Sequence, residues 1–207
     1  MAITFPRTWP ASPGPKIMGQ FPRSVSGKNE SPSTLVAERF RSAGRKLQLS
    51  LSYPAMTRAQ GDPFAAILAS LDGTFRAFRF GPHGDGANVK GQLGGTPRVN
   101  GANQLGNALL MKGGGGVVSG YLLAGDWIGL ITGANYWLHL VMQDMSTDGS
   151  GNGTIDIFPD LLEAPEDNDV IVTSSPKGTF HLLQPIEMVV GPAYNYEPFS
   201  LEIEQEL

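Results

Sequence analysis

The C-terminal stretch Phe199-Ser-Leu-Glu-Ile-Glu-Gln-Glu-Leu207 decides how this chain is divided. Apolar residues stand at positions 199, 201, 203 and 207, whereas serine and glutamate occupy 200, 202, 204 and 206. This period-two alternation predicts a β-strand with one buried face and one solvated face. A strand at the end of a chain needs a sheet to join, and we expect it to pair with strands near residues 46–53 and 74–80.

The segment 46–53 repeats the same pattern. Leu47, Leu49, Leu51 and Tyr53 share one face, and polar residues take the positions between them. Residues 74–80 are expected to form a shorter strand, in which two phenylalanines at 78 and 80 flank an arginine. We therefore expect these two segments to form the sheet that receives the C-terminus.

One helix is expected between these strands. Thr57 or Asp62 can cap its N-terminus, Pro63 suits a first turn, and Gly73 supplies a stop. The apolar residues between these signals recur at helical spacing, at Phe64, Ile67, Leu68 and Leu71.

The remaining strands divide into an outer and an inner set. Further strands are expected at 122–128, 136–142, 154–158 and 170–173, as a small antiparallel unit, and at 178–183 and 186–190. Because the C-terminal strand must reach back to 46–53, we expect one split β domain, 1–92 plus 178–207, with residues 93–177 inserted.

Two segments look irregular in the sequence. Residues 1–33 contain six prolines and are expected to form an extended arm with short strands at most. Residues 81–120 are rich in glycine and suggest a linker, with Gly113–Gly116 as a second flexible tract.

Composition narrows the class of protein. The 207 residues include 27 glycines and 16 prolines but only 16% charged residues, a mixture that suits strands and tight turns. The absence of cysteine excludes disulfides, thiolate catalysis and zinc–thiolate sites. We expect neither a signal peptide nor a membrane span, because no apolar run approaches the required length.

Charge is distributed unevenly along the chain. Residues 1–100 carry 13 Lys/Arg and 5 Asp/Glu, whereas residues 101–207 carry 2 and 14, so a net charge of +8 precedes one of −12. This polarity suits pairing between unlike surfaces, although two separately solvated surfaces would account for it equally well. The basic residues form no compact run, so nucleic-acid binding is a weaker alternative.

One loop resembles the start of a calcium site. Asp144, Ser146, Asp148 and Asn152 follow the oxygen-ligand spacing of such a loop, but Ile155 occupies the position of the closing glutamate. We expect a polar hairpin turn without metal. The Gly113–Gly116 run lacks the Lys-Ser/Thr sequence of a phosphate loop.

Other residue types offer no recognisable catalytic arrangement. The three histidines, at 83, 139 and 181, accompany no nucleophile motif, and His139 lies within an apolar strand. The acidic run 163–169 looks like a solvated loop, and Trp127 and Trp137 suit a small barrel core or, alternatively, a sugar platform. We therefore expect no enzyme and no catalytic, cofactor-binding or metal-binding residue.

Six short motifs give the chain a resemblance to a known family. In chain order they are Phe5-Pro-Arg-Thr-Trp-Pro10, Tyr53-Pro-Ala-Met-Thr57, Gly95-Thr-Pro97, Leu123-Ala-Gly-Asp-Trp127, Asp148-Gly-Ser-Gly-Asn152 and Pro176-Lys-Gly-Thr-Phe180. Their order and spacing resemble the distal tail proteins, minor tail proteins of long-tailed bacteriophages. The resemblance spans nearly the whole chain.

The resemblance implies a fold and a role. The fold would be mainly β: a split, β-sandwich-like belt domain with one α-helix, and an inserted small OB-like β-barrel. The role would be a structural ring of the virion, usually a homohexamer, that joins the tail tube protein to the tail-tip hub of the baseplate. DNA would only pass through its lumen, and assembly would occur in the host cytoplasm. The alternative is a carbohydrate-binding, receptor-recognising tail module that uses Trp127, Tyr136 or Trp137.

Such a ring would need two unlike faces on each subunit. A heterologous interface offers them, and the charge polarity of the chain suits it. Because exposed ion pairs contribute only ~0–1 kcal/mol each, we expect apolar and main-chain contacts of the N-terminal arm to hold the ring.

Overall fold

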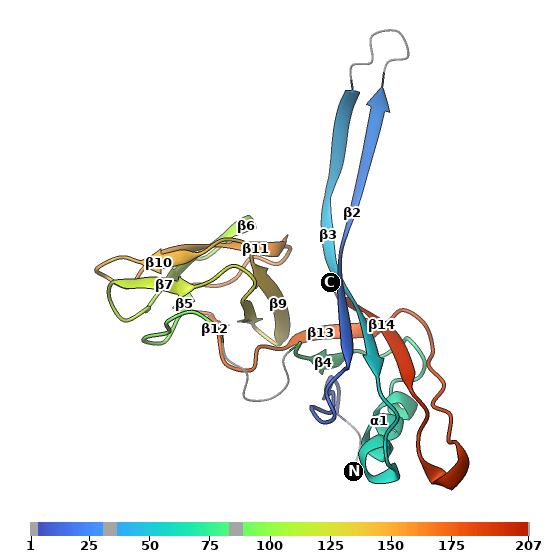
Figure 1. The fold of residues 1–207 in the computed structure, drawn as a ribbon. Coiled ribbons are helices and arrows are strands. Elements are labelled where there is room, and N and C mark those ends of the chain that lie inside the picture. Colours follow the sequence, from blue (N-terminus) through green and yellow to red (C-terminus); the bar gives the residue numbers. More distant parts are fainter. Residues whose placement is uncertain (1–3, 31–36, 83–88, 207) are drawn as a thin grey trace.

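Strands dominate the computed structural model, which describes residues 4–30, 37–82 and 89–206 (Figure 1). One sheet, the belt sheet, has the spatial order β1 (Arg7–Thr8), β4 (Phe78–Phe80), β13 (Gly178–Leu182), β14 (Phe199–Gln205), β3 (Ala37–Tyr53) and β2 (Ile17–Glu30). A closed barrel has the order β11 (Gly153–Leu161), β6 (Gly106–Lys112), β5 (Arg98–Val99), β12 (Val170–Val172), β8 (Trp127–Thr132) and β9 (Asn135–Val141). The other described elements are the pair β7 (Val118–Leu122) and β10 (Met145–Thr147), helix α1 (Arg58–Ser70) and a 3-10 turn, η1 (Pro192–Tyr194).

The predicted fold class is confirmed. The described chain is mainly β, with one α-helix and a small closed antiparallel barrel beside the belt sheet. Every barrel strand falls between residues 98 and 172, and every strand of the belt sheet falls outside that range. The domain bounds 1–92, 93–177 and 178–207 stay a prediction.

The C-terminal strand pairs as its alternation predicts. β14 runs antiparallel to β3, with Phe199 opposite Tyr53 and Ile203 opposite Leu49. Its other neighbour is β13, which in turn pairs with β4, so β14 does not touch the 74–80 region directly. The strand predicted at 74–80 covers only Phe78–Phe80, because the residues before Phe78 form the turn that follows α1. Leu207 lies outside the described residues.

An aromatic core lies between the belt sheet and α1. Trp9, Tyr53, Phe64 and Phe199 are all buried, and the rings of Tyr53 and Phe199 stack with centroids 5.0 Å apart. The Nε1 of Trp9 donates a hydrogen bond to the hydroxyl of Tyr53 at 2.9 Å, which satisfies both polar groups. Burial raises the pKa of Tyr53. The residues that alternate in β3 and β14 therefore do form the inner face.

Helix α1 begins where its capping residues predict. Thr57 is the N-cap, and Gln60 completes a capping box by accepting from the Thr57 backbone N–H at 3.1 Å. Phe64 and Ile67 are buried against the sheet, as is Leu71 at the C-cap. Pro63 lies inside the helix instead of in its first turn.

The barrel corrects several strand boundaries. The segment 122–128 is not one strand: it joins the end of β7 to the start of β8 through a turn. β6 runs through residues that glycine content had suggested were linker, and its buried Leu109 and Met111 fill the barrel core. Residues 186–190 form no strand beyond a single bridge between Val190 and Tyr196.

The prediction of short strands at most in residues 1–33 is wrong. β2 is a 14-residue strand that pairs with β3 from Ile17 opposite Ser52 to Glu30 opposite Ala37. Pro22 is tolerated because β2 is an edge strand, so a missing N–H need not break the pairing with β3.

Candidate assembly surface

The outer half of the β2–β3 hairpin extends beyond the belt sheet (Figure 1). β14 accompanies β3 only as far as Gln48, which lies opposite Glu204. Beyond this point β3 pairs with β2 alone, and Figure 1 shows the ribbon standing clear of both sheet and barrel. We call residues 23–30 and 37–47 the arm. An isolated two-stranded ribbon is only marginally stable and has two unpaired edges, so the arm is suited to contact another surface.

A buried carboxylate fixes the root of the arm. One oxygen of Glu204 accepts from Arg23 at 2.6 Å and the other from Lys46 at 2.9 Å. These two cations lie directly opposite each other on β2 and β3. Burial alone would raise the pKa of Glu204, but the hydrogen bonds from Lys46 and Arg23 outweigh it and hold the pKa below its usual value. Glu204 thus neutralises a like-charge pair that would otherwise weaken the ribbon.

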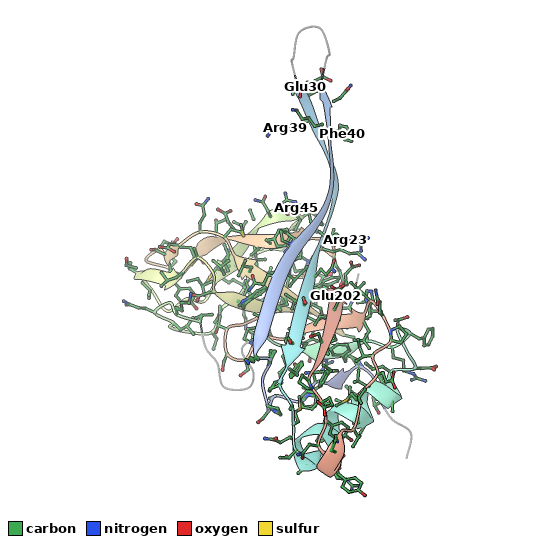
Figure 2. The ribbon with its side chains drawn as sticks, turned by 45° about the vertical axis from the view of Figure 1, so that its right-hand side comes forward. Arg23, Glu30, Arg39, Phe40, Arg45 and Glu202 are labelled. Atoms are coloured by element: carbon green, nitrogen blue, oxygen red, sulfur yellow. The ribbon has the colours of Figure 1, made fainter. Side chains whose placement is uncertain are left out.

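A second ion pair joins the arm to the barrel. Nε of Arg45, on β3, lies 3.4 Å from a carboxylate oxygen of Asp160, on β11. Both side chains are largely buried, at 20% and 17% exposure. Figure 2 shows Arg45 and Arg23 at the height where the ribbon leaves the body. The direction of the arm is therefore set by charges on both the belt sheet and the barrel.

The far end of the arm combines one aromatic ring with cations. Phe40 is 64% exposed, and its ring lies across Gly27, its partner on β2. Arg39 lies opposite Lys28 in the same ribbon, and both are exposed. Lys28 forms an ion pair with Glu30, whereas none is formed by Arg39 with any carboxylate of the described residues. Glu30, Arg39 and Phe40 stand together near the tip in Figure 2.

The aromatic residues suggested for sugar stacking are mostly hidden. Trp127 is 2% exposed and packs into the core of the belt sheet, and Trp137 is 9% exposed in the barrel core. Tyr136 is half-buried, with the guanidinium of Arg79 3.6 Å from its ring centroid. A cavity of about 370 Å³ adjoins Tyr136 and Trp137 where belt and barrel meet. Two of the three rings are therefore buried, and one face of the third is covered by Arg79.

The calcium-like loop is an Asp-capped turn. One oxygen of Asp148 accepts from the backbone N–H groups of Asn152 at 2.9 Å and Ser150 at 2.8 Å, and these bonds lower its pKa. Asp144 is occupied with the N–H of Ala124. Within residues 4–30, 37–82 and 89–206, no three acidic or histidine side chains gather closely enough to hold a metal ion.

The glycine run makes a tightly bonded turn. Gly114 N–H donates to Gly151 O at 2.8 Å, and Gly113 O accepts from Thr96 N–H at 2.9 Å. The hydroxyl of Thr147 donates to Gly116 O at 2.5 Å. The run therefore joins three loops through backbone contacts, instead of the flexible tract suggested by the sequence.

The structure describes two of the three histidines, His139 and His181. His139 is buried in the barrel, where Nδ1 lies 2.9 Å from Pro159 O, and burial lowers its pKa to about 4. This agrees with its interpretation as a structural residue. His181 is half-buried on β13, and His83 lies outside the described residues.

The acidic run 163–169 is used to fasten loops. Glu163 accepts from the Trp137 indole N–H at 3.0 Å, and Asp167 accepts from Lys112 and from a backbone N–H. The hydrogen bond from Lys112 is the main reason that the pKa of Asp167 lies below its usual value.

The burial of two carboxylates, Glu204 and Asp126, was not predicted from the sequence. Glu204 was expected on the solvated face of the last strand, yet it is only 4% exposed. Asp126 is 2% exposed and accepts from three backbone N–H groups, of Lys90, Gly91 and Leu123. No local pattern predicts that either residue is buried. The partners of Glu204 lie far away in the sequence, and two partners of Asp126 lie in a glycine-rich segment.

Comparisons with known proteins add no relative: no family model matches the chain, and no curated protein matches it. Over the part of the chain that the structure describes, no helix has the length and apolar character to cross a bilayer.

Proposed function

We propose that this chain is a structural subunit of a bacteriophage particle, one copy of a ring at the distal end of the tail. The observation that carries the proposal is the arm. It is a long two-stranded ribbon with unpaired edges, an exposed phenylalanine and exposed cations. A fold that holds such a ribbon in a fixed direction is suited to assembly with neighbouring subunits.

The symmetry of a ring fits these surfaces. A ring of more than two copies uses a heterologous interface, so each subunit presents two different faces. The arm supplies one of them, with six Lys/Arg and two Asp/Glu in its two segments. The acidic second half of the chain supplies candidates for the other.

The resemblance supplies the remaining expectations. Above and below the ring, the partners would be the tail tube protein and the tail-tip hub protein, and the number of copies would be six. DNA would pass through the lumen without being bound, which favours an acidic or neutral inner wall.

The carbohydrate-binding alternative has less support. Its proposed platform depends on Trp127, Tyr136 and Trp137, of which two are buried and one is covered on one side by Arg79. Sugar stacking needs an exposed ring face.

Electron microscopy of the purified protein tests the proposal directly. We expect closed rings from the wild-type chain at micromolar or higher concentration. A variant in which residues 25–44 are replaced by Asn-Gly should stay monomeric, because it lacks most of the arm. It can still fold, because Ser24 and Arg45 are register partners that a two-residue turn can join.

The shortened variant has an internal control. It retains β3 from Arg45 to Tyr53 and the whole aromatic core, so its near-ultraviolet circular dichroism should match the wild type. A wild-type chain that remains monomeric at every concentration would refute the proposal, and a shortened chain that still forms rings would refute the role of the arm in assembly.

A further inference from the structure

The arm carries two pairs of opposed cations, and in the second of them Arg39 forms no ion pair with a carboxylate of the described residues. At the root, Arg23 lies opposite Lys46, and Glu204 on β14 forms an ion pair with each of them. At the tip, Lys28 faces Arg39, and β14 does not extend that far. Like charges directly opposite each other destabilise a ribbon. Lys28 already pairs with Glu30, so Arg39 is the cation of this pair that can receive a carboxylate from another surface, as the root receives Glu204.

A surface with complementary chemistry lies at the other end of the molecule. Residues 186–197, which we call the prong, lie beside α1 at the end of the molecule away from the arm (Figure 1). Val189, Val190 and Tyr194 of the prong are 53%, 52% and 76% exposed. Glu187 and Glu197 are exposed beside them, and residues 178–207 contain no lysine or arginine.

The prong is held in shape by main-chain bonds. Gly191 N–H donates to Asn195 O at 2.8 Å, and Glu197 N–H donates to Val189 O at 2.9 Å. Tyr196 pairs with Met56 through two backbone bonds, which anchor the prong beside α1. Tyr194 is kept at a φ of +58°, a conformation that costs energy for a residue with a side chain. Neighbouring exposed apolar side chains such as Val189, Val190 and Tyr194 are typical of a contact surface.

We propose that the arm tip of one copy docks on the prong of a second copy of this chain. Phe40 packs against Val189, Val190 and Tyr194 on one face of the ribbon, and the long side chain of Arg39, which starts from the other face, reaches round the unpaired edge of β3 to the carboxylates of Glu187 and Glu197. The inference rests on the proposed function, since it names the receiving surface of the same assembly.

Two features favour a second copy over a different partner. The basic, aromatic tip and the acidic, apolar prong complement each other in both charge and polarity. They also lie at opposite ends of the long axis in Figure 1, so neither can reach the other within one chain without a large movement. Two unlike, complementary surfaces at opposite ends are what a head-to-tail contact requires.

Photo-crosslinking tests the contact. A photoreactive phenylalanine analogue placed at position 40 keeps the aromatic ring of the wild type, and mixing isotopically light and heavy chains separates intermolecular from intramolecular products. We expect light–heavy cross-links that map by mass spectrometry to residues 186–197.

A charge-reversal cycle gives an independent readout. We expect Arg39→Glu and Glu197→Arg each to raise the concentration at which assembly is half-complete by about tenfold or more, and the two changes in one chain to restore it. Glu166→Arg, at an exposed acid on the barrel, is the matched control and should have little effect.

The possible outcomes are distinguishable. Rings that form with cross-links from position 40 to other segments, or with no rescue in the double variant, would overturn the docking of arm on prong and leave the proposed function standing. A chain that never assembles would overturn both.

Discussion

Replacing Glu204 by glutamine should test how the arm is fixed to the body. The substitution keeps the size of the side chain and removes its charge. Glu204 has only 5% of its side chain exposed, and its two oxygens lie 2.6 Å from Arg23 and 2.9 Å from Lys46. Without the carboxylate, two cations would face each other across β2 and β3.

The expected cost follows from the exposure of the three groups. Exposed ion pairs contribute ~0–1 kcal/mol, whereas removing one partner of a buried pair costs about 3–5 kcal/mol. The side chains of Arg23 and Lys46 are 60% and 30% exposed, so solvent screens part of the interaction. We therefore expect a loss of about 2 kcal/mol in the free energy of unfolding at pH 7, an intermediate value.

The loss of unfolding free energy in Glu204→Gln should become smaller at low pH. The pKa of Glu204 is lowered in the folded chain from the ordinary value of 4.5. A group whose folded pKa is depressed contributes stability above its unfolded pKa and loses that contribution as the pH falls through the folded value. The difference between wild type and Glu204→Gln should thus be constant near neutral pH and shrink below pH 4.5.

Urea unfolding monitored by tryptophan fluorescence measures the difference. With a slope of about 2 kcal/mol per molar urea, the midpoint should fall by about 1 M. Glu202→Gln is the matched control, because Glu202 is an exposed glutamate two residues away on the same strand. Equal midpoints for wild type and Glu204→Gln, or an equal loss in Glu202→Gln, would show that the root of the arm is not held by this carboxylate.

Three further tests, two of them with a control substitution, concern the barrel and its loops. Asp126→Asn should cost about 1–3 kcal/mol, because a buried carboxylate that accepts three N–H bonds becomes an amide with one accepting oxygen; an unchanged urea midpoint would contradict this. Gly151→Ala should cost about 1–3 kcal/mol, since Gly151 has a φ of +75° and a Cβ there would meet a backbone nitrogen at 2.9 Å. Gly149→Ala, in the same turn with open space around it, should be nearly neutral by thermal unfolding, and equal losses in the two would rule out the steric explanation. Because the pKa of His139 is lowered from 6.5 to about 4, the unfolded chain binds more protons between these values and wild-type stability should rise with pH across that window. His139→Gln should flatten this rise and His181→Gln should keep it; a rise that persists without His139 would assign it to another group.

The structure also changes how the N-terminal region can be probed. Deleting residues 1–30 would not test the role of the arm alone. It would remove β2 and the buried Trp9, which packs against Tyr53 and Phe64. Loss of assembly in that variant would therefore report unfolding, which is why the replacement of residues 25–44 is the better experiment.

The sequence pattern was sufficient to predict a helix or strand where one face is buried and the other is exposed to solvent. The alternation in β3 and β14 predicted both strands and their pairing, because a one-residue slip would turn every leucine outward. The capping residue Thr57 and the apolar spacing after it predicted α1 in the same way.

Other features depended on partners that are distant in sequence. β2 forms in a proline-rich segment because β3 supplies its hydrogen bonds. β6 forms in a glycine-rich segment because β11, its neighbour in the barrel, pairs with it. Glu204 follows the pattern of a solvated residue, yet it is buried because Arg23, 181 residues earlier in the chain, comes to lie beside it. Apolar faces and turns depend on neighbouring residues, so they can be predicted from local pattern. Which charges meet and which ribbon stands free depend on where the sheet ends in space, so these features are known only once the chain is folded.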